Sequence, residues 1–303
     1  MRATAADALV SWSEVQDIEL VVVRRMHEYM TGAHPSVFEG SGFDLVGLRD
    51  WQPGDRLSSI DWSQSTLTNF SPLISREFEQ PSTARIVIIA DTSISTRCGA
   101  QGVPIATVIA RTVATFAMAG ALFQDQVGLI TFDGRSRQLS VRPQVGKNHA
   151  IHCLEAYQDV VLGRKKYEQE RIDNTFDGLL RKTSLVPLVS DFLFEDYEPL
   201  LDEVLKLQAS HDTFIVIVDS RHAYDMPVIA DGWIEVADVE TGQSRLLSSS
   251  ELQQLGDRIA VWQDTVEAAA LSRGLEVLRI GTDVDTFHGV VVQFLADRRL
   301  RKR

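Results

Sequence analysis

A carboxylate and two hydroxyls stand close together in this sequence at Asp91, Ser93 and Ser95. They directly follow an apolar run, residues 86–90, that is typical of a strand buried on both faces. Carboxylate and hydroxyl oxygens are hard ligands, which suit Mg²⁺, Mn²⁺ or Ca²⁺. An alternative stays open, because a lone Asp-x-Ser-x-Ser is common: Asp91 and Ser93 could simply cap the next helix.

A second carboxylate, Asp191, favours the metal interpretation. It also ends an apolar run, and two carboxylates at neighbouring strand ends repel each other unless a cation lies between them. Thr175 opens a predicted short helix and could add a third hydroxyl, although it could equally be that helix's N-cap. The candidate metal ligands are therefore Asp91, Ser93, Ser95, Thr175 and Asp191.

The apolar runs alternate with helical patterns, which predicts the scaffold for these residues. Strands are predicted at residues 86–90, 127–132, 139–141, 185–190, 213–218 and 276–280, and helices at 14–30, 104–123, 148–161, 175–182, 199–208, 251–273 and 284–299. Such alternation is typical of a doubly wound, mainly parallel α/β sheet. Ligands of these sheets bind beyond the carboxyl ends of the strands, where Asp91 and Asp191 fall. Asp219 also ends a strand, and we expect it to cap or to pair with Arg221.

The segment at residues 33–81 is rich in turn-forming residues and is predicted to form short strands and turns beside the sheet. Its possible anchors are Arg49, Trp51, Gly54, Asp55, Asp61 and Trp62. The two aspartates could accept hydrogen bonds from arginines or backbone amides. Trp51 and Trp62 are expected to bury large areas against the main sheet. A scaffold role is favoured over a binding surface.

The candidate ligands resemble, in order and rough spacing, the metal-ion-dependent adhesion site of von Willebrand factor A domains. The resemblance implies that Ser93, Ser95 and Thr175 contact the ion directly. It also implies that Asp91 and Asp191 act through water or hydrogen bonds. An acidic side chain of a partner protein would then supply a further ligand.

Residues 48–62 resemble the signature of the bacterial DUF58 family, Leu-Arg-x-Tyr-x-x-Gly-Asp-x-x-Arg-x-Ile-Asp-Trp. Trp51 stands for the usual Tyr and Ser58 for the usual Arg, which leaves the pairing of Asp55 and Asp61 open. The resemblance covers about residues 40–295. DUF58 proteins are commonly encoded beside MoxR-type AAA+ ATPases, so the resemblance implies an assembly or chaperone-like role with such an ATPase or its client.

Composition limits the classes of partner and the location. The net charge of −12 disfavours nucleic acid, because an acidic surface repels phosphates. The two cysteines suit a reducing compartment, and no apolar run near the N-terminus approaches the roughly 20 residues of a membrane span. The sequence thus predicts a cytoplasmic protein without a membrane span. Its predicted divisions are 1–82 (helix plus signature segment), 83–299 (von Willebrand A-like domain) and 300–303 (basic tail).

Three classes of function remain open: a metal-dependent protein-binding module, a phosphoryl-transfer enzyme of the haloacid dehalogenase type, and a scaffold with a vestigial metal site. The enzyme class needs Asp-x-Asp, with the second carboxylate as general acid or base. Ser93 stands at that position, and a Lys at the appropriate strand end is missing. We therefore expect a non-enzymatic binding module.

Overall fold

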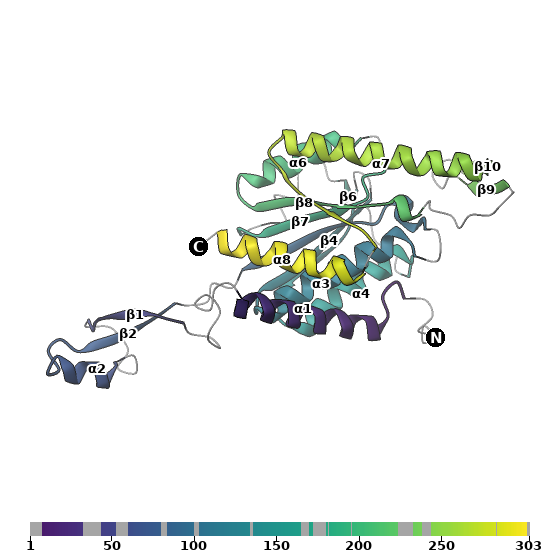
Figure 1. Cartoon of the computed structure of the whole chain (residues 1–303). Helices are drawn as coiled ribbons and strands as arrows, with labels where there is room; N and C mark the ends of the chain where they lie inside the picture. Colours follow the sequence, from purple (N-terminus) through teal and green to yellow (C-terminus); the bar gives the residue numbers. More distant parts are fainter. Residues whose placement is uncertain are drawn as a thin grey trace. The chain divides into compact units, whose positions relative to one another are not determined.

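The chain forms two compact units in the computed structural model (Figure 1). The structure describes residues 8–32, 44–52, 60–79, 84–99, 103–133, 136–164, 170–171, 180, 182–194, 196–223, 233–237, 244–282 and 284–301. One unit comprises Met1–Met26 and Ala84–Arg303, and the other comprises His27–Thr83. The helix α1 (Trp12–Gly32) thus belongs to the larger unit as far as Met26, whereas the sequence grouped it with the signature segment.

Seven strands of the larger unit form one sheet within the described part of the chain, in the order β11-β8-β7-β3-β4-β5-β6. These strands are β3 (Arg85–Asp91), β4 (Gln126–Asp133), β5 (Ser136–Gln144), β6 (Glu170–Arg171), β7 (Leu185–Ser190), β8 (Asp212–Val218) and β11 (Glu276–Ile280). The first five strands of the order are parallel, β5 runs antiparallel to β4, and β6 runs antiparallel to β5. The predicted mainly parallel α/β sheet is therefore confirmed, with β3 in its interior.

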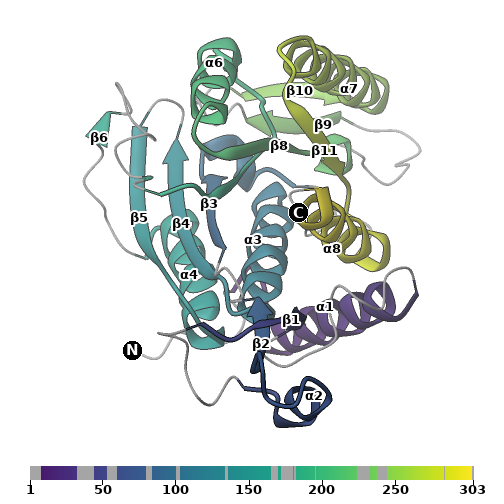
Figure 2. The ribbon, with the colours of Figure 1, turned by 90° about the vertical axis from the view of Figure 1, so that its left-hand side faces the viewer.

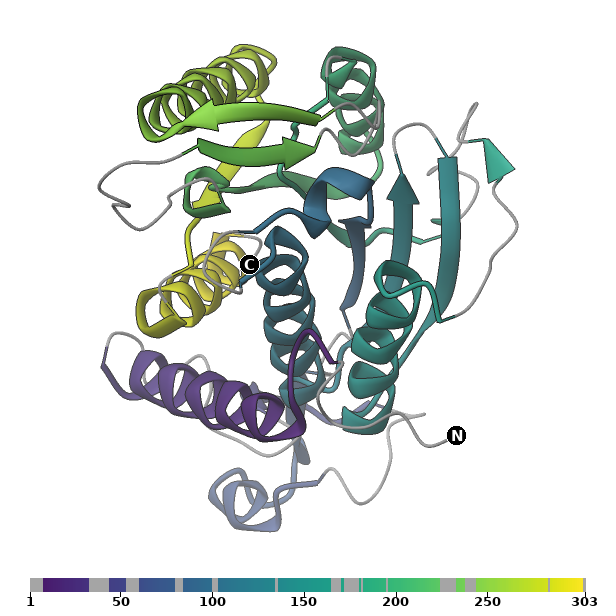
Figure 3. The ribbon, with the colours of Figure 1, turned by 90° about the vertical axis from the view of Figure 1, so that its right-hand side faces the viewer.

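Helices cover both faces of this sheet (Figures 2 and 3). One face carries α3 (Ile105–Leu122), α4 (Lys147–Val161) and α8 (Val284–Arg301), and the other carries α6 (Tyr197–Gln208) and α7 (Ser249–Ser272). By length and composition α3 could cross a membrane, but 89% of it is buried inside the structure. Such burial is what the central helix of a layered fold requires, because this helix is apolar on every side.

Helix α1 packs on the helices of one face. Its buried residues Val15, Ile18 and Val22 recur at helical spacing. On its surface, Glu14 accepts a 2.5 Å ion-paired hydrogen bond from Arg111 of α3. The helix predicted at residues 14–30 is confirmed and is two residues longer at each end.

The hydrogen-bonded ladder between β3 and β7 is interrupted. In the ladder between β3 and β7, Ile86 pairs with Leu185 and Ile89 with Leu188, and the intervening stretch contains Pro187, which has no N–H to donate.

Outside the main sheet, β9 (Trp233–Ala237) and β10 (Ser244–Ser248) form an antiparallel pair that the sequence analysis missed. Strand β10 shows no buried residue, so it lacks the apolar alternation that identifies a strand.

The smaller unit contains the antiparallel strands β1 (Asp44–Asp50) and β2 (Ile74–Glu79) and the helix α2 (Trp62–Leu67). Helix α2 corrects the prediction of strands and turns only, since six residues are too few to show a helical period. Asp61 is its N-cap and accepts the N–H of Gln64 at 3.1 Å. A backbone amide was one of the two kinds of donor expected for this carboxylate.

The two tryptophans of the smaller unit differ in exposure. Trp62 is 59% exposed and Trp51 is half-buried. Their packing against the main sheet would be a contact between the two units, and it stays a prediction. The buried side chains on the same segment are small or aliphatic, as at Ile60 and Ser65. Gly54 and Asp55 lie outside the described residues, and their predicted turn stays a prediction.

Candidate metal centre

Asp91 ends β3 and is fully buried at the carboxyl edge of the sheet. Its Oδ1 accepts the N–H of Ser93 at 2.8 Å, and its Oδ2 accepts the hydroxyl of Ser190, at the end of β7, at 2.5 Å. The hydroxyl of Tyr157 on α4 donates to the backbone carbonyl of Asp91 at 3.0 Å. Three elements therefore fix the position and orientation of this carboxylate.

The two predicted serine ligands lie side by side after β3. The hydroxyl oxygens of Ser93 and Ser95 are 3.0 Å apart and share a hydrogen bond. Ser93 occupies the N-cap position of the short helix η3 (Ile94–Arg97), but its side chain makes no capping bond. Both the N–H and the hydroxyl of Thr92 donate to the carbonyl of Phe132, which ties this loop to the end of β4. The serine hydroxyls are thus not used as helix caps.

Asp191 directly follows β7 and is also fully buried. Its Oδ1 accepts the N–H of Leu193 at 3.0 Å, whereas its buried Oδ2 has no hydrogen-bond partner within the described residues. The next residue, Phe192, has a left-handed φ of 53°, which costs a residue other than Gly about 1–3 kcal/mol. The Oγ of Ser190 accepts the N–H of Phe192, and Trp262 donates to the carbonyl of Phe192. These two hydrogen bonds hold Phe192 in its left-handed conformation.

Burial raises the pKa of Asp91 to about 6, from 3.8. The hydrogen bonds from Ser190 and from the backbone and side chain of Ser93 oppose that rise, and the negative charge of Asp133 adds to it. Asp133 ends the neighbouring strand β4, and sequence reasoning missed both it and Ser190 as parts of the site. The available signal was their position, because each is the last polar residue of a strand adjacent to β3.

Burial, followed by the charge of Asp91, raises the pKa of Asp191 to about 7. The amide of Leu193 and then the hydroxyl of Ser95 oppose this rise, although no hydrogen bond of standard geometry joins Ser95 to Oδ2. The pKa of Tyr157 lies well above its usual value of 10.0, because of burial and then the charges of the two aspartates. The two carboxylates therefore lie close enough to oppose each other's ionisation.

These carboxylate and hydroxyl oxygens are of the hard type that could ligate a cation. The described parts of the chain contain no group of three or more His, Cys, Asp or Glu residues that could hold a metal, so any site here would need other oxygen ligands as well. Asp91, Ser93, Ser95 and Asp191 meet at one edge of the sheet, and the orphaned Oδ2 of Asp191 fits the need for a positive partner. Thr175 lies outside the described residues, so its ligation stays a prediction.

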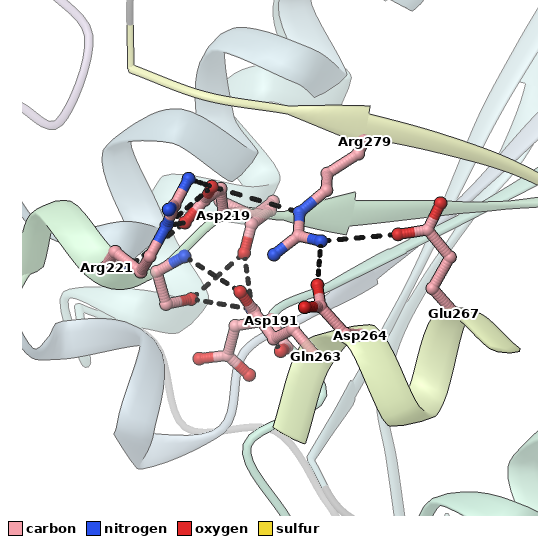
Figure 4. Close-up of polar contacts among 9 residues, drawn as sticks. Asp191, Asp219, Arg221, Gln263, Asp264, Glu267 and Arg279 are labelled. Carbon is pink, nitrogen blue, oxygen red and sulfur yellow. Dashed lines mark hydrogen bonds and ion pairs between the residues drawn. The ribbon is translucent and has the colours of Figure 1, made fainter. Parts of the chain in front are cut away.

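Asp219 directly follows β8 at the same edge but has its own cationic partners (Figure 4). Arg221 donates to its carboxylate through Nε at 3.1 Å and Nη2 at 2.7 Å, and Arg279 of β11 lies 3.8 Å away. Burial raises the pKa of Asp219, but the bonds and charge of Arg221 outweigh it and the pKa is lowered. The expected pairing with Arg221 is confirmed.

The fold and site together define an α/β protein with a buried carboxylate pair and two hydroxyls at the carboxyl edge of a mainly parallel sheet. The chain belongs to the DUF58 family: the family model, described as "Protein of unknown function DUF58", matches residues 47–262. The resemblance of residues 48–62 to this family is therefore confirmed. No curated protein matches the chain.

Three solved structures resemble the chain at low identity. The chain is similar to the conserved hypothetical protein BatB from Bacteroides thetaiotaomicron, with 12% identity over 71% of this chain and 98% of that one and a TM-score of 0.39. An aerotolerance-related membrane protein from Bacteroides fragilis matches with 11% identity, coverages of 71% and 99% and a TM-score of 0.41. An uncharacterized membrane-spanning protein from Vibrio fischeri matches with 14% identity, coverages of 72% and 98% and a TM-score of 0.21.

The cytoplasmic location predicted from the sequence is corrected by these comparisons. Two of the three similar structures are described as membrane proteins, and the cytoplasmic assignment is withdrawn. A domain that lies outside the bilayer has the same composition whether or not its protein is anchored in a membrane. Charge and hydropathy within such a domain therefore do not report the compartment.

Proposed function

We propose that this protein is a non-enzymatic, metal-ion-dependent protein-binding module with a von Willebrand A-like, Rossmann-type sheet. The observation that carries the proposal is the buried Oδ2 of Asp191, which lacks a hydrogen-bond partner within the described residues and lies in the field of Asp91. Two ionised carboxylates in a buried site are strongly unfavourable without a compensating positive charge. Mg²⁺ is the expected ion, with Mn²⁺ or Ca²⁺ as alternatives.

The hydrogen bonds support two different roles toward the ion. Both oxygens of Asp91 are occupied by donors, Ser93 N–H and the Ser190 hydroxyl, so Asp91 would act through water or hydrogen bonds. The paired hydroxyls of Ser93 and Ser95 would contact the ion, and Thr175 is the further candidate. When bound, the ion supplies a positive charge and an open coordination position for an acidic side chain of the partner. Mg²⁺ keeps several waters in protein sites, which leaves such a position exchangeable.

The proposed partner is a MoxR-type AAA+ ATPase or its client. Membership of the DUF58 family and the resemblance of the site to an adhesion site support this choice. The net charge of −12 supports neither an unaided contact with another acidic surface nor binding to nucleic acid. A cation bridge would let an acidic partner bind despite the repulsion between two negative surfaces.

Calorimetric titration of Mg²⁺ and Mn²⁺ tests the proposal. Wild type should bind one ion, whereas Ser93→Ala and Asp191→Ala should bind at least about tenfold more weakly, since each loses a ligand or a compensating charge. Asp219→Asn is the matched control, because Asp219 directly follows the adjacent strand β8 but pairs with Arg221. Its metal affinity should stay unchanged.

Partner capture with and without chelator completes the test. Loss of the ATPase or its client on chelation supports the proposal. A wild type that binds neither ion at millimolar concentration, even with partner present, contradicts the metal site. If the protein binds metal but still captures the partner in the presence of chelator, the ion is structural and the partner binds at another surface.

A further inference from the structure

Two consecutive residues of α7 donate hydrogen bonds to two consecutive backbone carbonyls of the loop after β7. The Nε2 of Gln263 donates to the carbonyl of Asp191 at 2.8 Å, and the Nε1 of Trp262 donates to the carbonyl of Phe192 at 2.8 Å. Gln263 is fully buried. Leaving a buried amide without hydrogen bonds is costly. The Gln263 amide therefore keeps the loop carbonyl in the position that completes its hydrogen bond.

Gln263 also bonds to the chain that follows β8 (Figure 4). Its Nε2 donates to the carbonyl of Val218 at 2.8 Å, and its Oε1 accepts the N–H of Ser220 at 3.3 Å. The hydroxyl of Ser220 lies 3.2 Å from the same Nε2. One side-chain amide therefore links the carboxyl ends of the two neighbouring strands, β7 and β8, at the edge where the candidate metal site lies.

The loop after β7 needs such support. Phe192 has a left-handed backbone without being glycine, and it is fully buried. This conformation persists only where the surrounding structure holds the adjacent peptide planes. The carbonyls that Trp262 and Gln263 hold are those of Phe192 and Asp191, so these bonds define the backbone from which the Asp191 carboxylate projects.

We infer that Trp262 and Gln263 are positioning residues that place the Asp191 carboxylate beside Asp91, and that Gln263 also links its loop to the loop after β8. Since both donors lie on α7, a shift of α7 moves Asp191 with it. The expectation that these residues affect metal affinity rests on the proposed function. Their role in holding the two loops does not. Neither residue is a metal ligand.

Amide hydrogen exchange of the two loops tests the inference in the full-length protein. Gln263→Leu removes the side-chain amide, with its donor and its acceptor, at similar volume. Trp262→Phe removes the indole donor and keeps an aromatic ring. Val266→Ala is the control. Val266 is a fully buried residue one turn along α7 that belongs to the main apolar core. It therefore reports the effect of weakening α7 packing alone.

At equal free energy of unfolding, Gln263→Leu should exchange about tenfold faster than Val266→Ala in residues 191–194 and in 219–221. Trp262→Phe should raise exchange in 191–194 only, because it bonds to Phe192 alone. If neither loop of Gln263→Leu exchanges faster than in the control, the inference is overturned.

Calorimetric titration of Mg²⁺ supplies the second readout. Gln263→Leu should weaken binding about tenfold, while Val266→Ala should stay within about twofold of wild type. If wild type binds Mg²⁺ and Gln263→Leu binds it equally well, the positioning role is refuted. If wild type binds no metal, the proposed function fails, and the exchange rates alone decide whether α7 holds the loops.

Discussion

The hydroxyl of Ser190 donates a 2.5 Å hydrogen bond to Oδ2 of Asp91 and so joins the carboxyl ends of β7 and β3. The same oxygen accepts the N–H of Phe192 at 2.9 Å, which supports the left-handed turn after Asp191. Ser190 is fully buried. One small side chain thus connects both candidate aspartates, although it is not itself a predicted ligand.

Replacing Ser190 by Ala should destabilise the protein by about 1–3 kcal/mol, because Oδ2 of Asp91 loses its donor while staying buried. The pKa of Asp91 should also rise further, since the Ser190 bond lowers it. Urea unfolding at pH 8 measures the first effect. Thr265→Ala is the control: it removes an exposed helix hydroxyl and should cost less than about 0.5 kcal/mol. Equal losses in the two variants would contradict the prediction.

The stability of the metal-free protein should fall as the pH rises from about 4 to 8. In the folded chain the pKa values of Asp91 and Asp191 are about 6 and about 7, against an ordinary aspartate pKa of 3.8, so the folded chain binds their protons more tightly than the unfolded chain. Their contribution is fully present below about pH 4 and is lost as the pH passes through 6 and 7. Urea unfolding in EDTA at pH 5 and pH 8 measures the slope.

The Asp191→Asn variant is the control for this slope. A neutral amide cannot ionise and removes the repulsion from Asp91, so the loss of stability between pH 5 and 8 should shrink. Adding Mg²⁺ to wild type at pH 8 should restore stability by mass action if the site binds the ion. An identical slope in Asp191→Asn would show that other groups cause the pH dependence.

Trp62→Ala should change stability by less than about 1 kcal/mol, because the indole is 59% exposed. Ile60→Ala should cost about 2–5 kcal/mol, since Ile60 is 5% exposed and loses a buried side chain. Thermal and urea unfolding of both variants measure the difference. A larger loss for Trp62→Ala than for Ile60→Ala would show that the indole is buried in solution.

The purified protein should not hydrolyse generic phosphomonoesters in the presence of Mg²⁺. Both oxygens of Asp91 already accept hydrogen bonds, and Ser93 stands where a general acid would be needed. A colorimetric phosphatase assay checks this. Clear turnover that Asp91→Asn abolishes would favour the phosphoryl-transfer class over the binding module.

The sequence by itself determined the class of fold and the position of the candidate site along the chain. Apolar runs of strand length that end in a polar residue predict buried parallel strands, and the strand ends carry Asp91 and Asp191. This information is local, because burial on both faces makes the whole strand apolar. The DUF58 signature is local for the same reason: residues 48–62 can be compared without knowing their neighbours in space.

Only the tertiary structure decided how the side chains at those strand ends are used. The bond from Ser190 to Asp91 depends on β7 lying beside β3, and the bonds from Gln263 depend on the position of α7. The exposure of Trp62 likewise depends on packing, not on residue type. Hydrogen bonds and burial between residues distant in sequence arise from the three-dimensional arrangement, so no pattern along the chain could predict them.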